Sequence, residues 1–218
     1  MKQIAVIGLS SFGYYLACRL AELGCEVLAI DKDEVMIDKV KDVVTKAVIA
    51  DATDSEALNE LGVVSFDAIV LSLGSDIEAS IISAMYLKDL GAKRIIAKVL
   101  SEEHLRVMRL LEVDQIIFPE RDTGYRLAHT LGEKNILEYL DLGSDFAVVE
   151  LPPQPEMIGK TLSELDFRNS YGCHIIAIRE RGPAGKTIIP GATDVIGEGH
   201  VLVLMGKEAD LEKLAGDG

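Results

Sequence analysis

The residues best placed to do chemistry form a short glycine-rich segment near the amino terminus, Gly8-Leu9-Ser10-Ser11-Phe12-Gly13. The segment directly follows a strand-like run and opens a helix-like one, which is the context in which a glycine-rich turn holds the phosphates of a dinucleotide. In that fingerprint the first glycine makes a tight turn, the second lets the backbone approach a phosphate, and the third permits close packing of helix on sheet. Ser10 replaces the second glycine and adds both bulk and a hydroxyl donor. A tight turn without any ligand is the alternative interpretation.

Acidic residues follow two of the predicted strands. Asp31 comes 23 residues after Gly8, at the position where a carboxylate accepts hydrogen bonds from both ribose hydroxyls of a dinucleotide. A carboxylate there disfavours a 2′-phosphate, so it favours NAD or an adenine nucleotide over NADP. The alternative is that Asp31 or Asp33 only caps the following helix. Asp51, one strand further along, is expected to border the adenine or to begin the turn into the next helix.

Further polar residues are expected at the same edge, because the carboxyl ends of parallel strands meet there. Ser72, Gly74 and Asp76 follow the fourth predicted strand, and Lys32 adjoins Asp31. Lys98, at the end of the fifth predicted strand, is either a phosphate contact or a solvated lysine. Together with the glycine-rich segment, these positions favour a nucleotide-binding site.

Groups suited to acid–base or nucleophilic catalysis are scattered along the chain. None of the four histidines, His104, His129, His174 and His200, is expected to have a paired acid at helix or strand spacing. Cys173 adjoins His174, but neighbours on a strand point to opposite faces. No nucleophile elbow, HExxH motif or P-loop occurs in the sequence. We therefore predict that the protein is not an enzyme.

Composition excludes several classes of protein. The chain has 218 residues, of which 49% are hydrophobic and 27% charged, which is typical of a globular protein with a packed core. Its formal net charge of -14 argues against nucleic-acid binding and against docking on anionic lipid. Three cysteines without CxxC spacing indicate neither a disulfide framework nor a zinc site. With no targeting signal and no membrane span in the sequence, we expect a cytoplasmic protein.

The first 118 residues alternate apolar runs with amphipathic segments. The predicted strands are Ile4–Ile7, Val27–Ile30, Ala47–Ala50, Ala68–Leu73, Arg94–Lys98 and Gln115–Phe118. The predicted helices are Phe12–Leu23, Val35–Val40, Ser55–Leu61, Ile77–Leu90 and Glu102–Leu111. Strands that read as unbroken apolar runs are buried on both faces, which is typical of a parallel sheet covered by helices. The pattern predicts a Rossmann-like, doubly wound α/β domain over 1–118.

The pattern changes after Phe118. Pro119 suits the first turn of a helix, and a second helical piece is expected at Ile136–Leu140, so residues 119–143 are predicted to form a helical crossover and dimerisation arm. Short β-rich runs separated by glycine and proline then predict a small α+β domain over 144–218. These runs are Phe146–Leu151, His174–Arg179, Thr187–Ile189 and Val201–Met205.

The order of these motifs resembles that of RCK domains, the cytoplasmic regulators of potassium conductance in Ktr and Trk uptake systems. The matching segments in the first part of the chain are Gly8–Gly13, Ala29–Asp31, Ala50–Thr53 and Leu73–Asp76 with Ser80. The segments Phe118–Gly124 and Tyr171–Ile178 extend the resemblance into a TrkA C-terminal domain. The resemblance covers essentially the whole chain, which is similar to a stand-alone regulatory subunit of the KtrA type.

The resemblance implies a function that is binding without turnover. Such subunits pair through the helical arm and assemble as octameric rings beneath a separate potassium-translocating subunit of the KtrB or TrkH type, at the inner face of the cell membrane. ATP, ADP or NAD(H) changes the shape of the ring. Carried onto this sequence, the resemblance implies that Gly8, Ser10 and Gly13 meet the phosphates and that Asp31 holds the ribose. The adenine would be bordered by Asp51, Ala52 and Thr53.

Two further ligands are implied by the resemblance. Glu120 matches a glutamate that helps some relatives recruit Mg²⁺ or Ca²⁺ near the phosphates, although an ordinary first-turn acid of a helix is the alternative. Some C-terminal domains of this kind bind cyclic di-AMP at their dimer interface. Arg168, His174 and Ile175 lie in the corresponding part of this sequence.

Two departures from the usual pattern bear on the choice of nucleotide. Ser10 and Ser11 replace a glycine and an arginine, which removes a charge-assisted contact to a terminal phosphate. Asp76 replaces a frequent asparagine. Both departures weigh against ATP-specific activation and favour ADP, AMP or NAD. Two other functions stay open at this point, a small NAD-dependent oxidoreductase and a scaffolding ring with a degenerate pocket.

Overall fold

The structure is a computed structural model that describes residues 1–182 and 185–216. The chain divides into two compact units, Met1–Glu120 and Arg121–Gly218. The predicted C-terminal domain includes residues 183, 184, 217 and 218, which lie outside the described residues.

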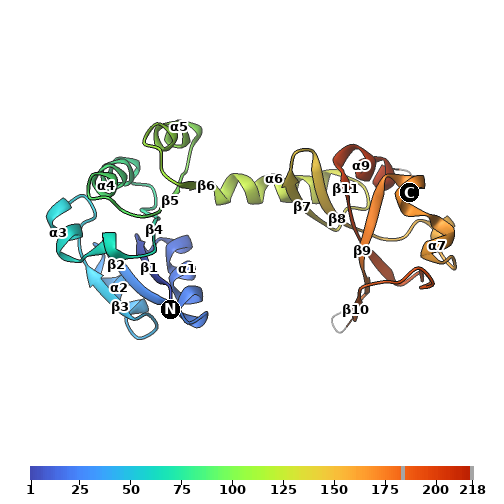
Figure 1. The fold of residues 1–218 in the computed structure, drawn as a ribbon, viewed down its shortest axis with the longest axis horizontal. Helices are drawn as coiled ribbons and strands as arrows, with labels where there is room; N and C mark the ends of the chain where they lie inside the picture. The colour runs from blue at the N-terminus through green and yellow to red at the C-terminus, as the bar shows by residue number, and fades with distance from the viewer. Residues whose placement is uncertain (183–184, 217–218) are drawn as a thin grey trace. The chain divides into compact units, whose positions relative to one another are not determined.

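The first unit is built on a six-stranded sheet whose neighbouring strands are all parallel (Figure 1). Its order is β3-β2-β1-β4-β5-β6, so the strand sequence reverses between β1 and β4. The strands are β1 (Gln3–Ile7), β2 (Glu26–Asp31), β3 (Lys46–Ile49), β4 (Ala68–Leu71), β5 (Ile95–Lys98) and β6 (Gln115–Ile117). The prediction of a Rossmann-like, doubly wound parallel sheet is confirmed.

Helices connect these strands, and polar side chains begin most of them. The helices are α1 (Ser11–Glu22), α2 (Glu34–Val40), α3 (Ser55–Glu60), α4 (Ile77–Asp89) and α5 (Glu102–Leu110), with a short 3-10 helix at Val63–Ser65. Asp33, Asp54, Asp76 and Ser101 each accept a hydrogen bond from a backbone N–H in the first turn of α2, α3, α4 and α5. Such caps satisfy donors that the helix itself leaves unpaired.

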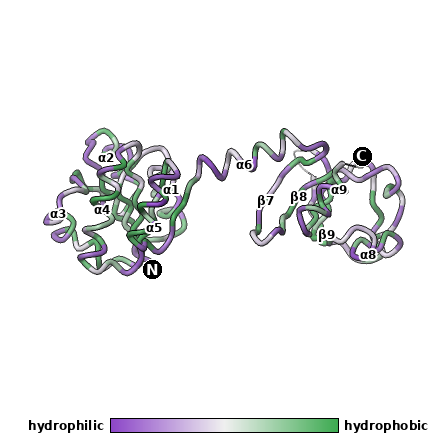
Figure 2. The backbone as a smooth tube through the Cα atoms, turned by 90° about the horizontal axis from the view of Figure 1, so that it is seen from above, coloured by the Kyte–Doolittle hydropathy of each residue, from purple (hydrophilic) through white to green (hydrophobic). Residues whose placement is uncertain are grey.

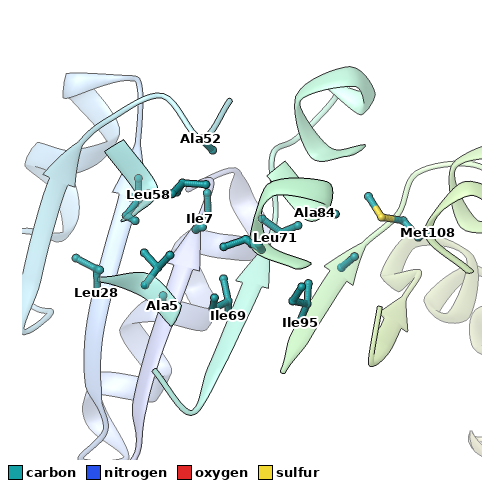
Figure 3. Close-up of a cluster of buried hydrophobic side chains, with 14 of the residues drawn as sticks. Ala5, Ile7, Leu28, Ala52, Leu58, Ile69, Leu71, Ala84, Ile95 and Met108 are labelled. Carbon is teal, nitrogen blue, oxygen red and sulfur yellow. The ribbon is translucent and has the colours of Figure 1, made fainter. Parts of the chain in front are cut away.

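Two hydrophobic clusters cover the two faces of the sheet. Side chains alternate along β1, so Ala5 and Ile7 join the cluster with α3, α4 and α5, whereas Ile4 and Val6 join the cluster with α1 and α2. Figure 3 shows side chains of the first cluster side by side on neighbouring strands. Burial on both faces explains why these strands read as unbroken apolar runs.

The second unit contains a five-stranded antiparallel sheet in the order β10-β9-β11-β8-β7. Its strands are β7 (Glu138–Gly143), β8 (Phe146–Leu151), β9 (Cys173–Glu180), β10 (Thr187–Ile188) and β11 (His200–Lys207). Its helices are α6 (Pro119–Gly132), which begins in the last residues of the first unit, the 3-10 helix Pro155–Met157, α7 (Leu162–Leu165), α8 (Phe167–Tyr171) and α9 (Glu208–Gly216). In Figure 2 the hydrophobic residues, coloured green on the backbone tube, lie mainly inside each unit. The prediction of a small α+β domain is confirmed.

The second helical piece expected at Ile136–Leu140 is wrong, because this stretch enters β7. β7 pairs with β8 across a two-residue turn, Ser144-Asp145, in which both residues have positive φ. Such a turn matches the twist of a hairpin, and its Ser-Asp sequence lacks the glycine that would have signalled it. The helix of the predicted arm is therefore α6 alone, and the rest of the arm is a short connection followed by β7 of the second sheet.

His104 occupies a packing position in α5, as expected for a histidine without a catalytic partner. The residue is 2% exposed, and neither ring nitrogen has a hydrogen-bond partner within the described residues. Burial lowers the pKa of His104, since the charged ring would lose its hydration.

This burial predicts a stability that falls as the pH drops below the usual histidine pKa of about 6.5. In that range the unfolded chain binds a proton that the folded chain resists. His104→Leu should remove part of the decrease in melting temperature between about pH 7 and pH 5.5. The contribution of His104 to the loss of unfolding free energy is at most about 1.4 kcal/mol per pH unit. The exposed His174 supplies the control, and equal pH dependence in His104→Leu and His174→Leu would contradict the prediction.

Candidate functional site: a cavity at the carboxyl edge of the parallel sheet

A cavity of about 490 Å³ lies at the carboxyl ends of β1, β2, β3 and β4. This is where the strand order reverses, the place where open α/β sheets bind their ligands. Ten of the predicted site residues line it, namely Gly8, Ser10, Ser11, Asp31, Lys32, Asp51, Ala52, Ser72, Gly74 and Asp76. Four predicted residues do not line it, namely Phe12, Gly13, Thr53 and Lys98.

The two glycines of the amino-terminal segment are required by close packing. Gly8 has a φ of +89°, and a Cβ atom there would lie 2.4 Å from the carbonyl oxygen of Ser72. A Cβ atom on Gly13 would lie 2.0 Å from the carbonyl oxygen of Gly8. Gly8 therefore makes the tight turn, and Gly13 lets α1 pack directly beneath it, in the roles that the fingerprint assigns to its first and third glycines.

Ser10 turns its hydroxyl toward the end of β4. Its Oγ lies 3.1 Å from the carbonyl oxygen of Ser72 and 3.0 Å from the Ser72 hydroxyl. Ser72 is fully buried, so this contact ties the glycine-rich segment to the central strand. No side chain caps α1, and the unpaired N–H groups of its first turn remain suited to an anion.

Asp31 holds the glycine-rich segment as well as facing the cavity. Its Oδ2 accepts a hydrogen bond of 2.5 Å from the Leu9 backbone N–H, and its Oδ1 accepts one of 2.9 Å from the Asp33 N–H. The cap of α2 is Asp33, which accepts from the Val35 N–H at 2.9 Å. Each carboxylate oxygen accepts more than one hydrogen bond, so Asp31 retains acceptor capacity for a ligand hydroxyl.

Asp51, just after β3, and Asp76, at the start of α4, line the same cavity. Asp51 Oδ1 accepts hydrogen bonds from the backbone N–H and the hydroxyl of Thr53, at 2.9 and 2.7 Å. These two bonds lower the pKa of Asp51, because they stabilise the carboxylate. Asp76 accepts from the Ala79 N–H at 3.0 Å, and Lys32 Nζ lies 3.4 Å from its other oxygen.

Lys98 is directed toward Glu120 at the start of α6. Its Nζ lies 2.6 Å from the Glu120 carboxylate and 5.9 Å from the centre of the Phe12 ring. The Lys98 side chain is 8% exposed, and the Glu120 side chain is 57% exposed. The hydrogen bond from Lys98 lowers the pKa of Glu120. The lysine thus lies between the first turn of α1 and the first turn of α6.

The residues around Glu120 do not fit Mg²⁺ or Ca²⁺ within one chain. These cations take about six or more oxygen ligands, whereas Glu120 is one carboxylate already paired with an ammonium group. In the part of the chain that the structure describes, no group of three or more His, Cys, Asp or Glu side chains is arranged to hold a metal. We derive no metal-dependent step for this site.

Removing the Glu120 carboxylate should destabilise the first unit, because it leaves the buried Lys98 ammonium without its counter-charge. Since Glu120 is largely exposed, we expect Glu120→Gln to cost about 1 kcal/mol in chemical denaturation, below the range for fully buried pairs. The double variant Lys98→Met/Glu120→Gln should recover most of this loss. A double variant less stable than Glu120→Gln alone would contradict the prediction.

The remaining candidate catalytic groups are not among the residues that line the cavity. Cys173 is buried and His174 is exposed, as expected for neighbours on a strand. Burial raises the pKa of the Cys173 thiol to about 11. One prediction is wrong: His129 does have an acid at helix spacing, because its Nδ1 lies 2.5 Å from Glu133 Oε1, four residues on. The His129 ring also stacks on Tyr139, which gives the pair a packing role in the second unit.

Sequence reasoning missed several residues of the cavity wall. They are Ile7, Leu9, Ile30, Asp33, Met36, Ala50, Leu73, Ser75 and Ala79. Most of them lie next to a predicted site residue in the sequence, at the end of a strand, and this position is the signal that could have identified them. Met36 is different, since it reaches the cavity from α2 and no motif marks it.

Along residues 1–182 and 185–216, no helix has the length and apolarity that a membrane crossing needs.

Family models match both parts of the chain. The TrkA-N domain matches residues 4–119, and the TrkA-C domain matches residues 146–216. A Rossmann-like sheet with a cavity at its switch point, followed by a small antiparallel domain, is thus the structure of a two-domain protein of the TrkA-N and TrkA-C class.

Similar proteins narrow this class to a family. The chain is 37% identical to Ktr system potassium uptake protein C of Bacillus subtilis, over 97% of this chain and 95% of that protein. It is 35% identical to Ktr system potassium uptake protein A of the same organism, over 100% of this chain and 97% of that protein. The chain belongs to the family of TrkA-N and TrkA-C domain regulatory subunits of Ktr and Trk potassium uptake systems.

Solved structures of the GsuK channel share the fold. One has a TM-score of 0.73 and 25% identity, and it covers 99% of this chain and 39% of the channel chain. Another, of the GsuK channel bound to NAD, has a TM-score of 0.53 and 24% identity, over 98% of this chain and 38% of that one. The chain therefore spans less than half of each channel chain.

Proposed function

We propose that this protein is a nucleotide-sensing subunit that forms a gating ring and controls potassium transport through a separate membrane protein. The family supplies the link to potassium uptake. The observation that carries the sensing role is the cavity of about 490 Å³ at the strand-order reversal, bounded by the glycine-rich segment and Asp31. Its volume is in the range of small-molecule sites.

The ligand proposed for this cavity is an adenine nucleotide or NAD(H), and the GsuK channel bound to NAD, which shares the fold, supports this class of ligand. The N–H groups at the start of α1 would receive the phosphates, Asp31 the ribose, and Asp51 with Ala52 the adenine. Binding, without turnover, is the proposed event. A ligand shifts a ring between two shapes only by its difference in affinity for them, so no catalytic group is needed.

Assembly through α6 is supported by apolar side chains on that helix. Tyr125 is 66% exposed and Leu131 is 77% exposed, with Leu127 between them also exposed. Leu127 and Leu131 lie four residues apart, so they share one face of α6, and exposed apolar groups on a shared face suit a partner surface. We propose that pairs of subunits meet here and build an octameric ring on the cytoplasmic side of a KtrB- or TrkH-type membrane subunit.

The C-terminal domain is a second proposed ligand site, for cyclic di-AMP. Arg168 and His174 are exposed there, and Ile175 is half-buried. An exposed guanidinium suits a phosphodiester, which is the support for this part of the proposal.

The test of the proposed function is calorimetric titration of the full chain with ATP, ADP, NAD⁺ and NADH, followed by small-angle scattering of the assembled ring with and without the ligand that binds. Micromolar binding together with a change in ring dimensions is expected. Binding without any change in shape would favour the scaffolding ring. Sustained consumption of NADH with small candidate substrates would favour the oxidoreductase.

A further inference from the structure

The charged side chains that line the nucleotide cavity are predominantly acidic. Asp31, Asp33, Asp51 and Asp76 line it, against one cation, Lys32. Four carboxylates and one ammonium give the described lining a net charge of -3 at neutral pH. No arginine contributes to the lining within the described residues.

The single cation of the lining already has an anionic neighbour. Lys32 Nζ lies 3.4 Å from Asp76 Oδ2, and both side chains are exposed to solvent. Lys98, the other lysine at a neighbouring strand end, is paired with Glu120 and does not line the cavity. Lys98 is therefore engaged away from the cavity, and Lys32 would share its charge between Asp76 and a phosphate.

The donors that remain for phosphates are neutral. Among the described residues they include the N–H groups in the first turn of α1 and the hydroxyls of Ser11 and Ser75, whereas the Ser10 hydroxyl is directed to Ser72. Neutral donors hold a pyrophosphate diester well, but they do not offset the added charge of a terminal phosphate. Each carboxylate of the lining repels that added charge.

Resting on the proposed nucleotide site, we infer that this cavity selects its nucleotide by net charge and binds oxidised NAD in preference to ATP. The nicotinamide ring of oxidised NAD carries a positive charge that offsets part of its pyrophosphate. ATP brings a terminal phosphate that meets, in the described lining, no cation except Lys32, which is shared with Asp76. Asp76 is the residue that sets this preference, because it adds a negative charge to the lining at the start of α4 and pairs with Lys32.

The first experiment is a charge series on the full chain, without divalent cations. Calorimetric titration with NAD⁺, AMP, ADP and ATP should give dissociation constants that rise from AMP to ATP, with NAD⁺ at least about tenfold tighter than ATP at low salt. Raising the salt from about 0.05 M to about 0.5 M should reduce the difference in affinity between NAD⁺ and ATP, because the screening length falls severalfold.

The second experiment compares two cap residues of the same type. Asp76→Asn removes one charge from the lining while keeping a good helix cap, so ATP affinity should rise about fivefold or more and NAD⁺ affinity should change less than about twofold. Asp54→Asn makes the same change at the cap of α3, outside the lining, and should leave the ratio of the two affinities unaltered.

The outcomes separate this inference from the function on which it rests. ATP binding as tightly as NAD⁺, or equal shifts in Asp76→Asn and Asp54→Asn, would overturn charge selection while the nucleotide sensor stands. If none of the four nucleotides binds, the proposed function is overturned, and this inference with it.

Discussion

Gly13→Ala should abolish nucleotide binding and lower the free energy of unfolding by about 3 kcal/mol. The added methyl group would lie 2.0 Å from the carbonyl oxygen of Gly8, a backbone atom that cannot rotate away. Either α1 moves off the sheet or the turn at Gly8 opens, and both changes disturb the N–H groups proposed to hold phosphate. Calorimetric titration and chemical denaturation measure the two effects.

Gly124→Ala is the matched control for this substitution. Gly124 lies inside α6, and a Cβ atom there would meet no described atom within 4 Å beyond its own stretch of helix. Alanine should therefore stabilise this helix by up to about 1 kcal/mol and leave nucleotide affinity in the first unit unchanged. Gly13→Ala binding with the affinity of the natural sequence would contradict the packing argument.

Asp31→Ala should weaken nucleotide binding about a hundredfold, or about 3 kcal/mol, if two charge-assisted hydrogen bonds to ribose are lost. The substitution should also destabilise the fold by about 1–3 kcal/mol, because it leaves the N–H of the buried residue Leu9 without its acceptor. Titration of the four nucleotides and denaturation of the same variant separate the binding effect from the folding effect.

Asp54→Ala serves as the control for Asp31→Ala. It removes a carboxylate that caps α3 outside the cavity, so it should cost about 1 kcal/mol of stability with no change in affinity. If Asp31→Ala loses only the stability that Asp54→Ala loses and binds nucleotide normally, Asp31 does not hold the ribose.

The parts of the site that the sequence predicts are those controlled by local geometry. Gly8 and Gly13 are spaced for a turn and a helix start, and the structure assigns them the close contacts that this spacing implies. Asp31 ends β2 and Asp51 follows β3, so a parallel sheet brings both to one edge. These inferences need only the strand boundaries and the parallel direction.

The parts that the sequence does not predict depend on distant partners. Lys98 pairs with Glu120 across 22 residues, which turns a candidate phosphate contact away from the cavity. β7 becomes a strand because β8 offers it a ladder, although Ile136–Leu140 suits a helix. The hydroxyl of Ser10 finds its acceptor on Ser72, 62 positions away. Tertiary contacts decide each of these cases.

The burial of Cys173 makes the two units chemically distinguishable. Cys18 and Cys25 of the first unit are partly exposed, whereas Cys173 is fully buried and its thiol pKa is about 11. Thiol reagents attack the thiolate, so the second unit stays unlabelled for as long as it stays folded. The rate at which Cys173 is alkylated therefore reports the opening of the second unit alone. A ligand that slows alkylation of Cys173 is bound by the second unit, and a ligand that slows alkylation of Cys18 or Cys25 is bound by the first.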